Sequence, residues 1–171
     1  MRKDVLMNRE IFFALQKSLF VFDKSSEHVL RQEKMLTLAQ FHVLAILSTM
    51  GTVSQQLVAE MLQNTQASVS RQVALLLRKK YITRTQNPKN KREYKLACTT
   101  LGVTEMKRAM TRMDSHFEHI FAVLAVDEKK HILTALKRLM QEVKKSQGID
   151  ASVCERMNTC ENSMKDNLRN L

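Results

Sequence analysis

A helix-forming segment that leads directly into a basic hairpin occupies residues 64–98, NTQASVSRQVALLLRKKYITRTQNPKNKREYKLAC. The spacing of its apolar residues predicts a helix over 66–80. Four of them are predicted to face inward: Val69, Val73, Leu76 and Leu77. The chain's only proline then marks a turn between strands predicted at 82–86 and 92–98, where Glu93-Tyr94-Lys95-Leu96 alternates with the period of a strand. In a chain whose remaining patterns are helical, this helix and hairpin decide the fold.

Two shorter helices are predicted just before this segment. Thr37 and Gln40 have the spacing of a capping box, in which each side chain bonds the other residue's backbone amide, and Met50-Gly51 ends the helix they open. Ser54 is the predicted N-cap of the next helix, QQLVAEML. The helix QQLVAEML and the helix at 66–80 are separated by a short break, and the hairpin follows the second of them. This order predicts a winged helix-turn-helix.

Longer helices are predicted on both sides of this core. Residues 8–33 carry apolar residues at roughly helical spacing, and a bend or interruption at Ser25-Ser26 is compatible with that pattern. IFFALQKSLFVF is apolar around more than one face, which is typical of a helix that packs against a further helix or a partner subunit. Downstream, Thr99 or Thr100 is expected to cap a helix that extends to about residue 125, and Asp127 is expected to cap another. The fold class is therefore mainly α with a small β-hairpin.

Composition indicates a folded, basic protein. The chain has 171 residues, of which 44% are hydrophobic, and its net charge is +11 with a pI near 9.8. Residues 71–95 hold nine basic residues and one acidic residue, so +8 of the charge lies in one short window. The predicted helix at 127–145, DEKKHILTALKRLMQEVKK, mixes both signs instead. Charge concentrated on a helix and a hairpin favours duplex nucleic acid as the partner.

The residues expected to contact DNA follow from the dimensions of the major groove. A helix fits that groove and presents its first turns to the base edges. The candidates there are polar and able to form hydrogen bonds: Gln66, Ser68, Ser70, Arg71 and Gln72. Thr65 and the helix N-terminus are expected to receive a phosphate. The hairpin is expected to place three basic residues near the adjacent minor groove or its phosphates: Lys89, Lys91 and Arg92.

The order of these elements resembles the winged-helix core of the MarR family of bacterial transcriptional regulators. The resemblance covers about residues 35–105, through LTLAQFHVLAIL, VSQQLVAEML, ASVSRQVALLLRKKYITR and NPKNKREYKLACTTLG. It implies a homodimer on a pseudo-palindromic operator, usually a repressor released by a small ligand or an oxidant. It also implies dimerisation helices at 1–35 and 100–147 around a DNA-binding core at 36–99. The polar tail, 148–171, is expected to be partly disordered or an extra helix.

The sequence departs from the family pattern in the wing and just before it. The family commonly has Asp-Arg-Arg before the second wing strand, where this chain has Asn90, Lys91 and Arg92. Asn90 cannot form the ion pair that an aspartate makes there, and Lys91 lacks the planar fork of arginine. Tyr81 stands where the family often has glycine, so a positive φ at that position would strain it.

Other sites have weaker support in the sequence. Cys98 is predicted to be a small buried residue, and oxidation of Cys154 and Cys160 is a minor alternative. His116 and His119 lie three residues apart on a helix, yet no further metal ligands are evident, so a solvated face is favoured over a metal site. No catalytic constellation or cofactor motif is present, and the protein is not expected to be an enzyme.

The sequence leaves two other functional classes open. A protein–protein adaptor that has lost DNA reading is the main alternative, because Asn90 and Lys91 alter the wing. A membrane-surface protein is disfavoured, since no basic amphipathic helix with Trp is present. The N-terminus lacks the apolar run of a signal peptide and no segment is apolar enough to span a membrane, so a cytoplasmic protein is expected.

Overall fold

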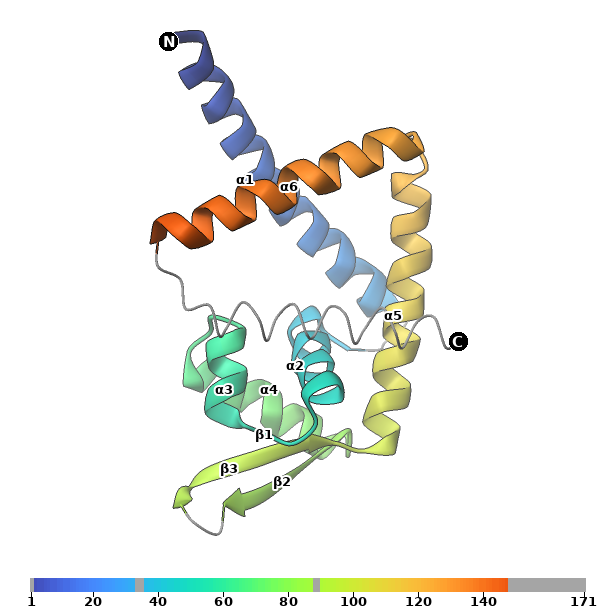
Figure 1. Cartoon of the computed structure of the whole chain (residues 1–171). Coiled ribbons are helices and arrows are strands. Elements are labelled where there is room, and N and C mark those ends of the chain that lie inside the picture. The colour runs from blue at the N-terminus through green and yellow to red at the C-terminus, as the bar shows by residue number, and fades with distance from the viewer. Residues whose placement is uncertain (1, 33–35, 88–89, 148–171) are drawn as a thin grey trace.

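The computed structural model of the chain describes residues 2–32, 36–87 and 90–147 (Figure 1). The elements, in order, are α1 (Arg2–Gln32), α2 (Leu38–Met50), β1 (Val53–Ser54), α3 (Gln55–Met61), α4 (Gln66–Arg78), β2 (Ile82–Asn87), β3 (Asn90–Cys98), α5 (Thr100–Phe121) and α6 (Val126–Gln147). The predicted fold class, mainly helical with a small sheet and a winged helix-turn-helix core, is confirmed. The prediction for the tail at 148–171 lies outside the described residues.

Side-chain caps start most helices of the core where the sequence predicts them. Thr37 and Gln40 form the complete capping box of α2, and the hydroxyl oxygens of Ser54, Thr65 and Thr99 accept backbone N–H bonds at the starts of α3, α4 and α5. The prediction for Asp127 is wrong. The last helix begins at Val126, and the Glu128 carboxylate accepts the backbone N–H of Ala125 at 2.7 Å, so the cap comes from the following acidic residue.

The hydrophobic core lies around α2, which is buried along most of its length. Apolar side chains from α4, the base of the hairpin and α5 pack around it. Their fully or nearly fully buried members are Val69, Val73, Leu76, Ile82, Leu96, Met106 and Ala109. Figure 1 shows the result, with α2, α3 and α4 grouped above the sheet and α5 leading away from it. The outer face of α4 is left free of this packing.

The sheet has three antiparallel strands in the order β1-β3-β2. Val53 pairs with Leu96 on one side of β3, and Ile82 pairs with Cys98 on the other. The pairing continues to Asn87 and Asn90, with an irregularity after Gln86, so the hairpin is longer than the sequence predicts. β1 was not predicted. It ties the residues before α3 to the centre strand and so fixes the hairpin against the helix-turn-helix.

The end of α4 explains how the chain turns from helix to hairpin. The backbone N–H of Lys80 bonds Leu77 O at 2.9 Å, and that of Tyr81 bonds Leu76 O at 3.0 Å. This is a Schellman arrangement, which requires a left-handed residue in the middle, and Lys80 supplies it with φ of 59°. The strain expected at Tyr81 is therefore located one residue earlier. A non-glycine residue in this conformation costs about 1 kcal/mol.

The first helix, α1, is continuous through Ser25 and Ser26, and the hydroxyl of Ser26 donates to Phe22 O at 2.8 Å. Its C-terminal part joins the core through Val29 and Leu30. The Glu27 carboxylate accepts the Leu38 N–H at 2.6 Å and so links α1 to the start of α2. Partial burial raises the pKa of Glu27, but the hydrogen bond from Leu38 and the Arg31 guanidinium outweigh it and hold that pKa below its usual value.

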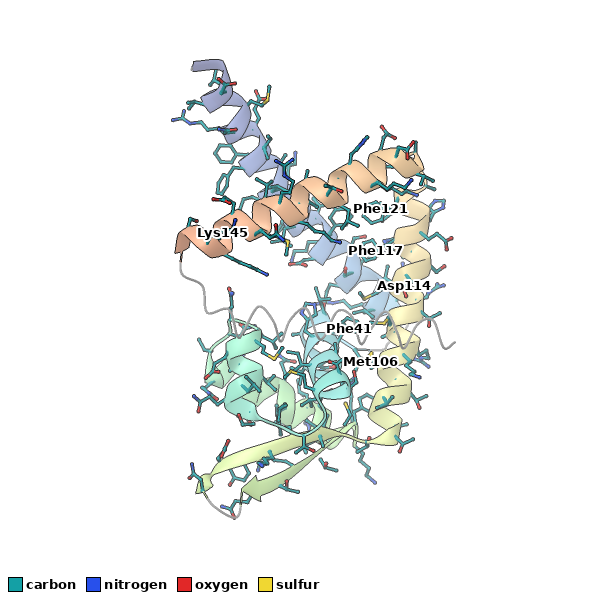
Figure 2. All side chains as sticks on the ribbon, in the orientation of Figure 1. Phe41, Met106, Asp114, Phe117, Phe121 and Lys145 are labelled. Carbon is teal, nitrogen blue, oxygen red and sulfur yellow. The ribbon has the colours of Figure 1, made fainter. Side chains whose placement is uncertain are left out.

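Aromatic packing joins α1 to α5. The ring of Phe22 lies 5.7 Å from both Phe117 and Phe121, and Figure 2 shows these two residues on the upper half of α5. Ser25 Oγ and His116 Nε2 are 2.7 Å apart in the same region. These contacts hold the two long helices together and leave the first half of α1 outside the core.

Many apolar side chains remain exposed on α1 and α6. On α1 they include Val5, Leu6, Ile11, Phe12, Phe13, Leu19 and Phe20, and on α6 they include Ile132, Leu133, Leu139, Met140 and Val143. Exposed apolar area of this extent is typical of a protein–protein surface. None of the helices within 2–32, 36–87 and 90–147 has the length and hydropathy needed to cross a membrane.

Candidate nucleic-acid interface

The outer face of α4 is polar and built from small or hydrogen-bonding side chains. Six residues at helical spacing are exposed on it: Gln66, Ala67, Ser70, Arg71, Ala74 and Arg78. The side chains of two alanines and a serine are short, so a flat or grooved partner can come close to the helix backbone. Gln66, Ser70 and Arg71 then offer amide, hydroxyl and guanidinium groups for hydrogen bonds.

The start of α4 is suited to an anion. Thr65 Oγ1 accepts the backbone N–H of Ser68 at 3.2 Å, which caps the helix, and Thr65 itself is exposed. The first turn contains no acidic residue, so the positive end of the helix dipole is not neutralised there. These features favour a phosphate near Thr65.

Two of the predicted interface residues lie on the other flank of α4. Ser68 and Gln72 are half-buried and line a pocket of about 220 Å³ between α1, α2 and α4. The Gln72 Oε1 atom is buried and has no hydrogen-bond partner among the described residues. Because α1 and α2 cover this flank, Ser68 and Gln72 are not part of the exposed face that carries Gln66, Ser70 and Arg71.

The pocket contains ionisable groups. Asp23 of α1 and His42 of α2 both line it, together with Asn64 from the turn before α4. Although His42 remains solvent-exposed, partial desolvation lowers its pKa, and the carboxylate of Asp23 acts in the opposite direction. The pocket therefore combines a carboxylate, an imidazole and two side-chain amides next to the helix with the polar face.

The hairpin adds basic residues beside α4. Lys89 lies outside the described residues, and the backbones of Lys91 and Arg92 lie in β3. The sequence pattern alone does not point to Arg84, whose guanidinium lies 4.4 Å from the ring centroid of Tyr94. The alternating strand pattern contains both residues. That they are neighbours follows only from the register of the hairpin, which pairs Arg84 with Leu96.

Three exposed basic residues connect the end of α4 with the hairpin: Arg78, Lys79 and Lys80. The Lys79 Nζ atom donates to Gln40 Oε1 at 3.4 Å and lies 5.7 Å from the centroid of the Tyr81 ring. No acidic residue occurs between Gln66 and Arg92. The basic window predicted from the sequence thus includes a continuous run of exposed cationic residues on adjoining elements.

The other candidate sites lack support from the geometry. Cys98 is half-buried, its Sγ lies 3.7 Å from Leu44 O, and burial raises its pKa to about 11, so the thiolate is scarce at neutral pH. Cys154 and Cys160 lie outside the described residues. Among the residues that the structure describes, no three His, Cys, Asp or Glu side chains are grouped as metal ligands, and His116 is engaged with Ser25.

Comparison with known proteins identifies the region that carries this surface. The family model described as "MarR family" matches residues 36–94, from the start of α2 through most of the hairpin. These residues form a MarR-family domain. The resemblance read from the sequence is therefore confirmed.

Relatives of this MarR-family domain extend the similarity to the flanking helices. An uncharacterised HTH-type transcriptional regulator of Bacillus subtilis, YvnA, is 27% identical over 131 residues, which cover 70% of this chain and 83% of that protein. The apo crystal structure of wild-type MarR from E. coli has a TM-score of 0.67 at 22% identity and covers 77% of this chain and 94% of its own. A mutant E. coli MarR in complex with operator DNA has a TM-score of 0.63 at 19% identity, covering 75% and 94%. The MarR-like fold therefore includes elements outside residues 36–94.

Proposed function

We propose that this MarR-family protein is a transcriptional regulator that binds duplex DNA sequence-specifically as a homodimer. The exposed face of α4 carries this proposal, because it combines small residues with hydrogen-bonding groups and is flanked by Arg78, Lys79 and Lys80. A helix of 13 residues fits the major groove, which is about 12 Å wide. Gln66, Ser70 and Arg71 would contact base edges there, and Thr65 would contact a phosphate.

The solved E. coli MarR complex with operator DNA supports this assignment by analogy of fold. The wing would lie at the adjacent minor groove or its phosphates, with Lys89, Lys91 and Arg92 as its contacts. Residues 36–99 would be the DNA-binding unit. Ser68 and Gln72 are not included among the base-reading residues, because the packing of α1 and α2 turns them toward the pocket.

The test of this proposal is the affinity of full-length protein for DNA fragments selected from the genome. Wild-type protein should bind selected sites tightly, and log K should fall steeply with log salt concentration. Arg71→Ala should weaken binding by about 1–3 kcal/mol if its guanidinium reads a base. Lys137→Ala, which removes the same charge from exposed α6, should not weaken it.

Failure of the wild-type protein to prefer any duplex over a neutral control at low salt would rule out this function. The adaptor alternative would then be favoured, and a protein partner should survive substitution of Arg71 and Arg92 by alanine.

We further propose that α1 and α6, within residues 1–35 and 100–147, form the interface with a second copy. The exposed apolar residues of these helices would be covered in that dimer. Two copies of α4 would then read major grooves one helical turn, about 34–36 Å, apart, so the operator should be pseudo-palindromic.

The pocket between α1, α2 and α4 supports repression that a small ligand relieves. A ligand held by Asp23, His42 and Gln72 would contact the inner flank of α4 and shift the helix, so that its outer face would no longer fit the DNA. His42→Phe should fill the pocket and leave operator affinity unchanged. In a reporter strain, this variant should keep repressing under every growth condition that relieves repression by the wild type; normal relief by the variant would contradict the role of the pocket.

A further inference from the structure

One guanidinium on the hairpin is held in place by an aromatic ring. The Arg84 Cζ atom lies 4.4 Å from the centroid of Tyr94, and no carboxylate of the described residues pairs with it. Both residues are exposed, Tyr94 by 38%. A cation over an aromatic face within 6 Å is attracted to it, and arginine favours this arrangement because its planar group can stack.

The register explains why these side chains meet. Arg84 pairs with Leu96 and Gln86 pairs with Tyr94, so Arg84 and Tyr94 are diagonal neighbours on one face of the hairpin. Ile82 and Leu96, both buried, lie on the same face, so Arg84 continues the core-facing side of the sheet beyond the core. β2 also packs against α4, so the side of the hairpin that carries Ile82 and Arg84 is the side turned toward the helices. Lys95 points to the opposite face.

Stacking on the ring leaves the N–H donors of the guanidinium available for hydrogen bonds. The ring covers one face of the planar group, whereas its N–H donors point outward around the edge. A phosphate is recognised through such edge donors, often two at once. The ring also restricts a flexible side chain before binding, so less conformational freedom is lost when a phosphate is bound.

We propose that Arg84 is a phosphate-binding residue for duplex DNA at the base of the wing, and that Tyr94 is the residue that positions it. This inference rests on the proposed function, because the phosphates belong to the DNA that α4 reads. It assigns a contact to the hairpin that does not depend on Lys89, Lys91 or Arg92 at the tip.

The experiment measures binding of full-length variants to a selected operator duplex over a series of salt concentrations. Arg84→Gln should reduce the slope of log K against log salt by about 0.9 for each bound protomer, since one phosphate contact is lost. Lys95→Gln removes the same charge from the opposite face of the same hairpin and should leave the slope unchanged. Tyr94→Phe should bind as the wild type does, because the ring remains.

The positioning role of Tyr94 has its own signature. Tyr94→Leu should weaken binding about two- to fivefold for each protomer, the range of an exposed cation–π contact, while the salt slope stays that of the wild type because the charge remains. The double variant Arg84→Gln/Tyr94→Leu should bind no more weakly than Arg84→Gln alone. If Tyr94 affected DNA binding only through the stability of the hairpin, the losses of affinity caused by the two substitutions would instead add in the double variant.

The outcomes separate this inference from the function on which it rests. If wild-type protein binds the operator but Arg84→Gln keeps its slope, or if Lys95→Gln lowers the slope equally, the role of Arg84 is overturned and DNA binding stands. Additive effects of the two substitutions would overturn the role of Tyr94. Absence of wild-type binding would overturn the proposed function itself.

Discussion

Gly102→Ala should destabilise the protein by about 3 kcal/mol, the upper range for forcing extra atoms into a filled site. A Cβ atom at residue 102 would lie 1.9 Å from the carbonyl oxygen of Tyr81. That carbonyl cannot easily move, because it accepts the Thr99 N–H at 3.0 Å and lies 3.1 Å from the Thr99 hydroxyl. The junction of α4, the hairpin and α5 would have to open. Urea denaturation, followed by circular dichroism, measures the change.

Gly51→Ala is the matched control for this substitution. Gly51 has φ of 71° and ψ of −131°, outside the left-handed helical region, and no atom of the described residues lies within 4 Å of an added Cβ atom, so backbone strain of about 1–3 kcal/mol is expected without a steric clash. At position 102, inside α5, alanine would normally stabilise the helix relative to glycine by about 1 kcal/mol.

The predicted loss of stability must therefore come from the clash with Tyr81. A Gly102→Ala variant as stable as the wild type would show that α5 does not approach Tyr81 as closely as described.

Leu139→Glu should convert the proposed dimer into monomers and abolish tight operator binding. Leu139 is exposed and shares one face of α6 with Ile132, Leu136 and Val143. An unpaired carboxylate in that apolar surface should cost an interface about 3–5 kcal/mol. Because two α4 helices must bind together, loss of the dimer also removes the second half-site. Analytical ultracentrifugation over a concentration series, with parallel DNA binding, measures both effects.

Gln141→Glu introduces the same charge on the opposite side of α6 and should leave both properties unchanged. If Leu139→Glu still sediments as the wild type does, the exposed apolar face of α6 does not hold the second copy. If it is monomeric yet binds the full operator with unchanged affinity, DNA recognition does not need the dimer.

The starts of the core helices could be predicted because each is determined by side chains within a few residues. The oxygens of Thr37, Ser54 and Thr65 cap amides three residues further along the chain, so sequence spacing contains the necessary information. The end of α4 is different. The left-handed residue is Lys80, and no local glycine marks the position.

Features that depend on distant pairing could not be predicted in this way. β1 has two residues, and it is a strand only because Val53 meets Leu96 across the sheet. The inward position of Gln72 depends on α1 and α2 covering that flank of α4. The contact between Arg84 and Tyr94 likewise needs the register of the hairpin. Sequence patterns therefore predict the helices and strands that carry the proposed interface, but not which flank of each one is covered.

The continuity of α1 has a mechanical consequence. Its 31 residues at 1.5 Å each make a rod of about 46 Å, with no break at Ser25 or Ser26. One end carries the exposed apolar residues, and the other joins the Leu38 amide through Glu27. Because α1 has no hinge, a tilt imposed on its N-terminal half must also move its C-terminal end. That movement would reach α2 and then α4, which packs against α2.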